Sequence, residues 1–157
     1  MGLDTKTRRK DWRSDRDMRN TEAAKSLLNQ SIRRIETAER ELRGGSLAYS
    51  IRSSQEAVEL GLKAALRLLG IEYPKKHDVG PVLIKFRDRF PQWFPVDRLA
   101  KISRKLAEKR EPAMYGDELS MTPADLLFDK SEAEESLEMA KETYNTVKKL
   151  FSEYAEY

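Results

Sequence analysis

Three polar side chains recur at helical spacing within an otherwise apolar stretch, and they are the first candidates for chemistry. Gln55, Glu59 and Lys63 stand at positions i, i+4 and i+8, so a helix places an amide, a carboxylate and an ammonium along one ridge. An exposed ion pair at this spacing adds only about 0.3–0.5 kcal/mol to stability. The ridge is therefore interpreted either as a solvated face or as the wall of a polar crevice that takes a ligand or a second subunit.

The composition excludes several other kinds of site. The chain has no cysteine, which excludes disulfide scaffolds, zinc ribbons, iron–sulfur clusters and thiol nucleophiles. His77 is the single histidine, and neither a metal site nor a cofactor is predicted. The motifs GxGxxG, GxxxxGK[ST] and HExxH do not occur, so a dinucleotide fold, a P-loop and a zinc protease are unsupported. Glu134 and Glu135 fall on the polar face of a helix and receive no catalytic role.

The elements that must position the ridge are all helical. Apolar residues at steps of three and four, with glycines Gly44, Gly45 and Gly70 as helix ends, predict an all-α fold. Its architecture is predicted as an up-and-down bundle of four to five helices with a long C-terminal helix. The expected helices cover 20–43, 46–69, a short stretch from Asp78, about 96–109, and 124–155; the expected loops are 71–77 and 110–121.

The C-terminal helix shows a heptad-like apolar seam. A helix over 124–155 would be about 45 Å long, which exceeds a small bundle. The seam is therefore expected either to face a second subunit in part or to pack entirely on the first two helices of its own chain. Its members are Ala133, Leu137, Ala140, Tyr144, Val147, Phe151 and Tyr154.

A length of 157 residues indicates one domain, with a different composition at its start. Residues 1–19 hold seven basic and four acidic side chains and are predicted to form a basic, mobile N-terminal arm. Residues 20–157 are predicted to form the helical bundle. No apolar run approaches the roughly 18 residues of a membrane span, and residues 1–19 lack the apolar stretch of a secretory signal. A cytoplasmic location and no membrane partner are therefore expected.

Charge is distributed unevenly along the chain. Residues 116–157 carry 11 acidic and 4 basic side chains, whereas residues 75–110 carry 11 basic and 4 acidic ones. Such asymmetry indicates either a phosphate-rich partner for the basic part or a self-complementary assembly.

Three segments of the chain together resemble HEPN domains. The stretch from Gln55 to Leu66, QEAVELGLKAAL, is similar to the family's QAvEkalKAlL pattern, and His77-Asp78-Val79 followed by Val82-Leu83 is similar to its HDL…LL segment. The stretch from Arg110 to Asp117, REPAMYGD, is similar to the loop before the last helix in prokaryotic members. The three segments occur in the family's order over roughly residues 20–150.

The resemblance implies a small prokaryotic protein that forms a homodimer and works beside a minimal nucleotidyltransferase, with nucleotide binding. One branch of the family contains metal-independent RNases and toxins of toxin–antitoxin systems, whose site is an Arg followed after four to six residues by His. Here Arg110 is followed at that spacing by Tyr115, and a tyrosine pKa near 10 makes a poor general base at neutral pH. No catalytic residue is therefore assigned; Arg110, Tyr115 and His77 remain weak candidates.

Three functions follow as alternatives. The first is a binding and assembly module in which Gln55, Glu59, Lys63, His77, Arg110 and Tyr115 form the ligand-binding site. In it, Arg110 grips a phosphate of a nucleotide or RNA and Tyr115 stacks on a base. The second is an RNase toxin with a degenerate Arg-x4-Tyr site, and the third is a purely structural homodimer. For Arg110 and Tyr115, the competing interpretation is that they pin a loop, and for His77 that it locks a loop to the bundle.

Overall fold

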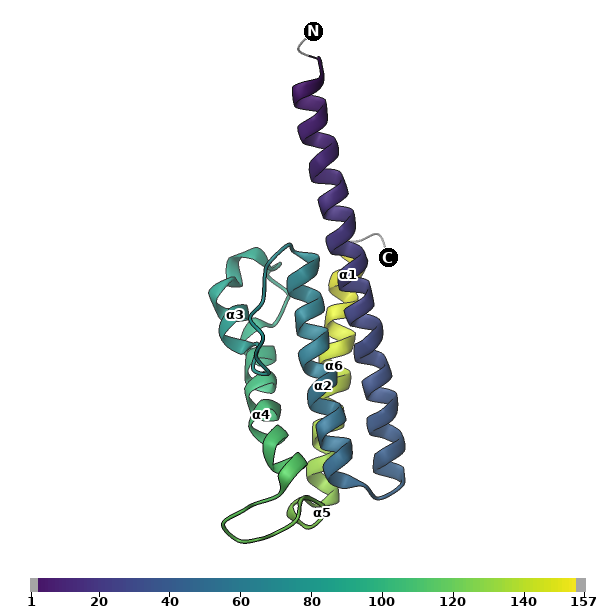
Figure 1. The fold of residues 1–157 in the computed structure, drawn as a ribbon, viewed down its shortest axis with the longest axis vertical. Helices are drawn as coiled ribbons and strands as arrows, with labels where there is room; N and C mark the ends of the chain where they lie inside the picture. Colours follow the sequence, from purple (N-terminus) through teal and green to yellow (C-terminus); the bar gives the residue numbers. More distant parts are fainter. Residues whose placement is uncertain (1–2, 155–157) are drawn as a thin grey trace.

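A computed structural model describes the backbone of residues 3–154 and the side chains of residues 16–154 (Figure 1). In this part of the chain the regular structure is helical apart from one isolated bridge between Asp117 and Thr122, which confirms the predicted all-α up-and-down bundle. None of the described helices has both the length and the apolar character that crossing a bilayer would require. The elements are α1 (Leu3–Arg43), α2 (Leu47–Leu68), α3 (Gly80–Lys85), the 3-10 turn η1 (Arg87–Arg89), α4 (Val96–Tyr115), α5 (Ala124–Leu127) and α6 (Lys130–Tyr154).

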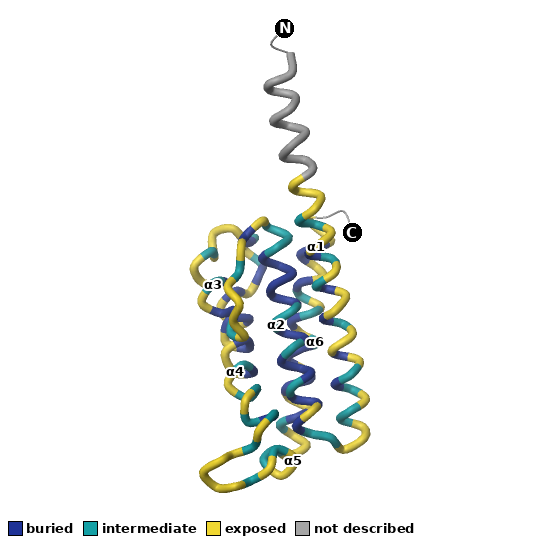
Figure 2. The backbone as a smooth tube through the Cα atoms, in the orientation of Figure 1, coloured by how far each residue is buried: buried dark blue, intermediate teal, exposed yellow. Residues whose placement is uncertain are grey.

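Helix α2 is the centre of the bundle and packs against α1, α4 and α6. It is buried along most of its length, as Figure 2 shows. Small residues let α1 approach it closely: the Ser31 hydroxyl donates to the Ala57 carbonyl at 2.7 Å, and the Ser50 hydroxyl donates to the Ala38 carbonyl at 2.8 Å. These hydrogen bonds satisfy the buried hydroxyls at the contact between the two helices and hold α2 against α1 without any contribution from the polar ridge.

Helix α1 begins earlier than the sequence predicts. A start at Asn20 or Thr21 was expected, but the Thr21 hydroxyl donates to the carbonyl of Asp17 four residues earlier, as it does inside a continuous helix. The expected start is therefore wrong, because capping residue types are also tolerated within a helix. The side chains of residues 1–15 lie outside the described part of the chain, so the mobile arm over residues 1–19 stays a prediction.

Helix α4 extends to Tyr115, so the first part of the expected loop 110–121 is helical. Pro112 lies inside the last turn, where its missing N–H removes one helical hydrogen bond. Tertiary contacts outweigh this loss, because Ala113 is buried in a second apolar cluster with Ala48 and Ala133. The chain leaves the helix at Gly116, whose φ of 75° is readily adopted only by glycine.

The expected C-terminal helix over 124–155 is interrupted. Phe128 is extended, and Asp129 Oδ1 accepts the Glu132 N–H at 2.8 Å, so a new helix begins there. Helix α6 has 25 residues and is about 37 Å long, rather than 45 Å. Most of its seam is buried within the chain against α1 and α2, and only Tyr154 among its members is exposed. The buried members of the seam therefore pack on their own chain.

A buried glycine sets the spacing at the centre of the bundle. A Cβ on Gly61 would lie 3.2 Å from Ser31 Oγ and 3.6 Å from Thr143 Cγ2, so a large side chain there would force α1 or α6 to move. We expect Gly61→Leu to lower the free energy of unfolding by about 1–3 kcal/mol through overpacking. Urea unfolding measures the change. The control Gly44→Leu stands at an exposed turn and should shift stability by less than about 0.5 kcal/mol; equal effects of both variants would contradict this account.

Candidate functional site

The polar ridge of α2 is largely buried rather than solvated. Gln55 is 2% exposed and Lys63 is 9% exposed, and the Glu59 side chain between them is 16% exposed. A charged pair at such depth must be hydrogen-bonded, because burying unpaired charges costs several kcal/mol. The solvated-face interpretation of the ridge is therefore wrong, and its groups belong to a covered polar network.

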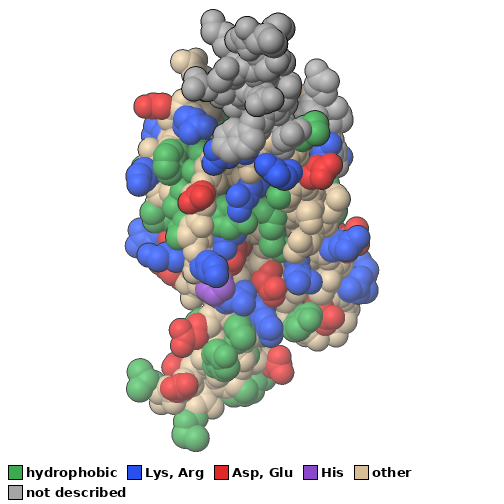
Figure 3. Space-filling model, turned by 45° about the horizontal axis from the view of Figure 1, so that its top comes forward, with side chains coloured by type: hydrophobic (Ala, Val, Ile, Leu, Met, Phe, Trp, Pro, Cys, Tyr) green, Lys and Arg blue, Asp and Glu red, His purple; other side chains and the backbone are tan. Residues whose placement is uncertain are grey.

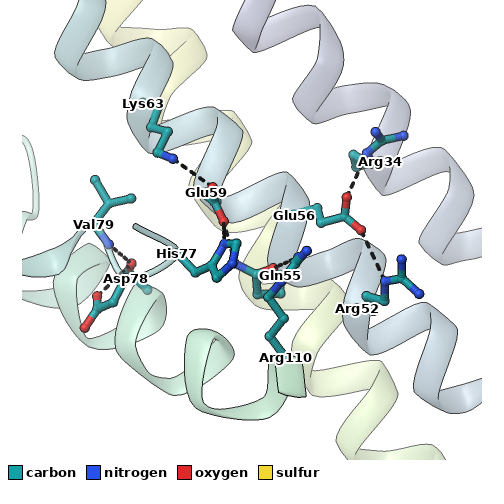
Figure 4. A network of polar contacts seen from close by, with 11 residues as sticks. Arg34, Arg52, Gln55, Glu56, Glu59, Lys63, His77, Asp78, Val79 and Arg110 are labelled. Atoms are coloured by element: carbon teal, nitrogen blue, oxygen red, sulfur yellow. Dashed lines mark hydrogen bonds and ion pairs between the residues drawn. The ribbon is translucent and has the colours of Figure 1, made fainter. Parts of the chain in front are cut away.

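The Glu59 carboxylate joins this network together (Figure 4). Its Oε2 accepts from Lys63 Nζ at 2.8 Å, and its Oε1 accepts from Gln55 Nε2 at 3.0 Å. His77 Nδ1 lies 2.7 Å from the same Oε1. An ionised carboxylate only accepts, so Nδ1 is the donor and the outer nitrogen Nε2 is left available to a further partner.

Arg110 joins the network from α4. Its Nη1 donates to Gln55 Oε1 at 2.7 Å, which leaves the Gln55 amide nitrogen for Glu59. Among the described residues, the other donors of this guanidinium have no hydrogen-bond partner. The fold thus brings together five of the six predicted ligand-binding residues, from α2, the 69–79 connection and α4: Gln55, Glu59, Lys63, His77 and Arg110.

Tyr115, the sixth predicted residue, lies beside this network without a hydrogen bond to it. Its side chain is 67% exposed and lines an open hollow of about 370 Å³ together with His77, Arg110 and Met114. His77 and Arg110 also line a smaller hollow of about 140 Å³ towards α1, which Arg34 and Glu56 border. The histidine and the arginine therefore line both of the adjoining hollows. Figure 3 shows the histidine among basic and acidic side chains on this face.

Two residues that flank the network, Arg34 and Glu56, were not predicted as site residues from the sequence. Arg34 of α1 lies 3.4 Å from Glu56, which also lies 3.7 Å from Arg52. The contact joins residues 22 positions apart, and no local pattern distinguishes Arg34 from other surface arginines. Within residues 16–154, no cluster of three metal-ligating side chains occurs.

The connection that carries His77 is fixed at several points. Tyr73 packs under the cationic groups of Lys63 and Arg67, at 5.3 and 5.1 Å from its ring centre. At the other end, Asp78 accepts the Gly80 N–H at 2.9 Å and the Ser103 hydroxyl at 3.1 Å. The short helix expected from Asp78 begins two residues later, at Gly80, with Val79 at the N-cap of α3. His77 is thereby held over Glu59.

Comparison with known proteins assigns this chain to a family. The HEPN domain profile matches residues 24–150, which is most of the chain and includes the whole polar network. This chain belongs to the HEPN domain family. No match is found among curated proteins.

Two solved structures share the fold of this HEPN domain. A crystal structure of TT1696 from Thermus thermophilus has a TM-score of 0.68 at 24% identity and covers 80% of this chain and 96% of its own. The crystal structure of ST0689, an archaeal HEPN homologue, has a TM-score of 0.64 at 20% identity and covers 81% of this chain and 96% of its own. At these identities the likeness concerns the fold.

The electrostatics of the HEPN domain's network favour an ionised Glu59. Burial raises the pKa of this carboxyl, but hydrogen bonds from Lys63, Gln55 and His77 and the charge of Lys63 outweigh burial and hold the pKa below its ordinary value. A lowered pKa stabilises the folded state above the unfolded-state value of about 4.3, and this stabilisation is lost as pH falls through the folded-state pKa.

We therefore expect Glu59→Gln to make the free energy of unfolding depend less on pH in the acidic range. Between pH 7 and pH 3 the wild-type free energy of unfolding should fall more steeply than that of the variant, because only the wild type must protonate this carboxylate. Urea unfolding at each pH measures the difference. Glu138→Gln, at an exposed position of α6, is the control and should keep the wild-type slope. Parallel profiles for wild type and Glu59→Gln would contradict the ionised network.

Proposed function

We propose that this HEPN domain is a binding module that takes a phosphate group of a nucleotide or nucleic acid at the hollow between Arg110 and His77. The observation that carries the proposal is the state of Arg110. One donor is fixed by the buried Gln55 amide, and the remaining donors of the guanidinium have no partner among the described residues and border the hollow. A planar guanidinium held in place in this way suits the bidentate recognition of a phosphate.

The surroundings of Arg110 support an anionic ligand. Lys75 and Lys76 directly precede His77, are exposed, and have no ion pair in the described part of the chain. The exposed ring of Tyr115 lines the same hollow and offers a face on which a base can stack. An arginine suited to a phosphate, a ring suited to a base and two exposed lysines together favour a nucleotide or a short single strand over an isolated inorganic anion.

The partnership with a minimal nucleotidyltransferase is part of this proposal. A module that holds the phosphates of a nucleotide can present or withhold the substrate of such an enzyme. The charge balance of residues 75–110, with 11 basic and 4 acidic side chains, supports a phosphate ligand but does not select the enzyme.

Replacing the arginine tests the site. We expect Arg110→Ala to weaken the binding of ATP and of a short RNA by roughly ten- to a hundredfold, since a charge-assisted bond is worth about 1.5–3 kcal/mol. Binding of RNA to the wild type should weaken steeply with salt through counterion release. Calorimetric titration at low and high salt measures both effects.

Two measurements separate a binding site from a structural anchor. Arg104→Ala removes another arginine of α4, one that is exposed and paired with Glu108, and should leave affinity unchanged. Thermal melts report the cost of leaving the Gln55 amide unpaired in Arg110→Ala. A lower melting temperature with unchanged affinity per folded molecule would reject the phosphate site and favour a structural role for Arg110.

RNA cleavage is a second candidate, favoured by one observation. His77 is hydrogen-bonded through Nδ1 to a carboxylate, and it lines the same two hollows as Arg110, so the chain carries an oriented imidazole in the same site as a guanidinium. The histidine comes from the connection before α3 rather than from the position that Tyr115 occupies. This arrangement offers a general base that the Arg110-x4-Tyr115 spacing alone lacks.

We expect the wild-type protein to bind structured RNA without cleaving it, because the position that carries histidine in the family's RNases holds Tyr115. Incubation with structured RNA in the presence of a chelator, followed by gel analysis, measures cleavage. Metal-free cleavage that disappears in both His77→Ala and Arg110→Ala, but persists in Arg104→Ala, would overturn this expectation and establish the RNase as the better account.

A further inference from the structure

The two hollows beside Arg110 differ in size and in chemical character. The smaller hollow measures about 140 Å³, and its lining is polar except for Leu60. The larger hollow measures about 370 Å³ and has Ala107, Met114 and Tyr115 among its lining residues. Pockets that take a drug-sized ligand measure roughly 300–1,000 Å³. The larger hollow therefore suits a nucleoside, whereas the smaller hollow has room only for compact polar groups such as phosphates.

Arg34 borders the smaller hollow from α1 and has hydrogen-bond donors to spare. Its Nε lies 3.4 Å from Glu56 Oε2, and Glu56 Oε1 lies 3.7 Å from Arg52 Nε. Both contacts are ion pairs, and in the described part of the chain no acceptor takes a hydrogen bond from the Arg34 guanidinium. A guanidinium carries five N–H donors in a planar fork that matches two phosphate oxygens. Arg34 thus offers an anion in this hollow the same kind of contact as Arg110.

The two arginines approach the hollow from opposite sides. Figure 4 shows Arg34 of α1 on one side of α2 and His77 with Arg110 on the other, while Glu56 and Glu59 extend from α2 between them. Arg34, Arg110 and His77 all line the smaller hollow. A ligand that is held by one phosphate at Arg110 and continues into this hollow therefore approaches Arg34.

The smaller hollow is positively charged when all its charged groups are counted. Glu59, which lines it, is paired with Lys63, and Glu56 is paired with Arg34 and Arg52. With His77 neutral, four cations and two carboxylates give a balance of +2: Arg34, Arg52, Lys63 and Arg110 against Glu56 and Glu59. Glu111 borders the larger hollow and not the smaller one. The smaller hollow therefore favours the more highly charged part of an anionic ligand.

We propose that Arg34 is a second phosphate-binding residue, and that the ligand is a nucleoside di- or triphosphate whose phosphate chain runs from Arg110 into the smaller hollow. The proposal rests on the phosphate site at Arg110 and gives the ligand a direction. The base lies at Tyr115, the first phosphate between His77 and Arg110, and the last phosphate at Arg34. Phosphates joined by anhydride bonds follow one another without a sugar between them, which suits a hollow of about 140 Å³. An RNA strand would bring a second nucleoside to this place.

Nucleotides that differ in their number of phosphates test the role of Arg34. In calorimetric titrations with a chelator present, we expect the wild type to bind ATP roughly tenfold more tightly than AMP, through the added charge-assisted contact. Arg34→Gln should remove most of this preference and leave the affinity for AMP unchanged. The matched control, Arg33→Gln, removes the same charge from the next position of α1, which borders a different hollow, and should keep the preference.

A second variant separates a contact with phosphate from the neutralisation of Glu56. In Arg34→Gln the Glu56 carboxylate keeps only Arg52 as a partner and repels a phosphate more strongly. Glu56→Gln removes this repulsion, so Arg34→Gln should still weaken ATP binding about tenfold in the Glu56→Gln background. If Arg34→Gln has no effect in that background, Arg34 only neutralises Glu56 and the proposal is wrong. Thermal melts of all variants should match the wild type, because exposed ion pairs add little stability.

Three further results would overturn the proposal: an equal loss of ATP and AMP affinity in Arg34→Gln, the same loss in Arg33→Gln, or a larger loss for the dinucleotide pUpU than for ADP. ADP and pUpU each carry two phosphates, and the last result would identify a strand as the ligand. AMP binding that depends on Arg110, with an ATP preference that does not depend on Arg34, rejects only this proposal. A wild type that binds neither nucleotide rejects the phosphate site as well.

Discussion

The carboxylate of Glu59 is the group on which the arrangement of the site depends. It is the common acceptor for Lys63, Gln55 and His77, and through the amide of Gln55 it also determines which atom is offered to Arg110. Four polar groups from three separate segments therefore take their positions from one half-buried anion. In the covered environment of α2 each of these bonds is stronger than it would be in water, and each loss leaves a buried group unpaired.

The bundle makes such a network possible by holding its central helix in place. Gly61 and the bonded serines Ser31 and Ser50 let α1 pack closely on α2, and α6 covers the opposite side. With α2 fixed from two sides, its remaining ridge faces α4 and the connection that carries His77. The HEPN fold thus lines the hollow with α4 on one side and the shorter, tethered connection that carries His77 on the other, which is a common arrangement for a binding site on a helical bundle.

The last turn of α4 carries two residues of the proposed phosphate site. Arg110 and Tyr115 border the hollow, and the chain leaves the helix directly after them at Gly116. The charge along the chain changes sign at the same place, with a basic stretch before residue 111 and an acidic one from there onwards. The basic stretch supplies the groups that would attract the proposed phosphate ligand to this turn.

The sequence by itself determined the helical class, the bundle and the ridge Gln55–Glu59–Lys63, because these depend on local periodicity and on spacing within one helix. The family followed from the resemblance of three segments of the chain. It did not determine the ends of α1 and α4 or the break before α6, since there contacts such as the burial of Ala113 outweigh local preferences for caps and loops. The burial of the ridge, the bond from Arg110 to Gln55 and the place of His77 beside Arg110 were decided only by the tertiary structure. These residues are 33 to 55 positions apart, and no local pattern encodes which distant side chain completes a buried hydrogen bond.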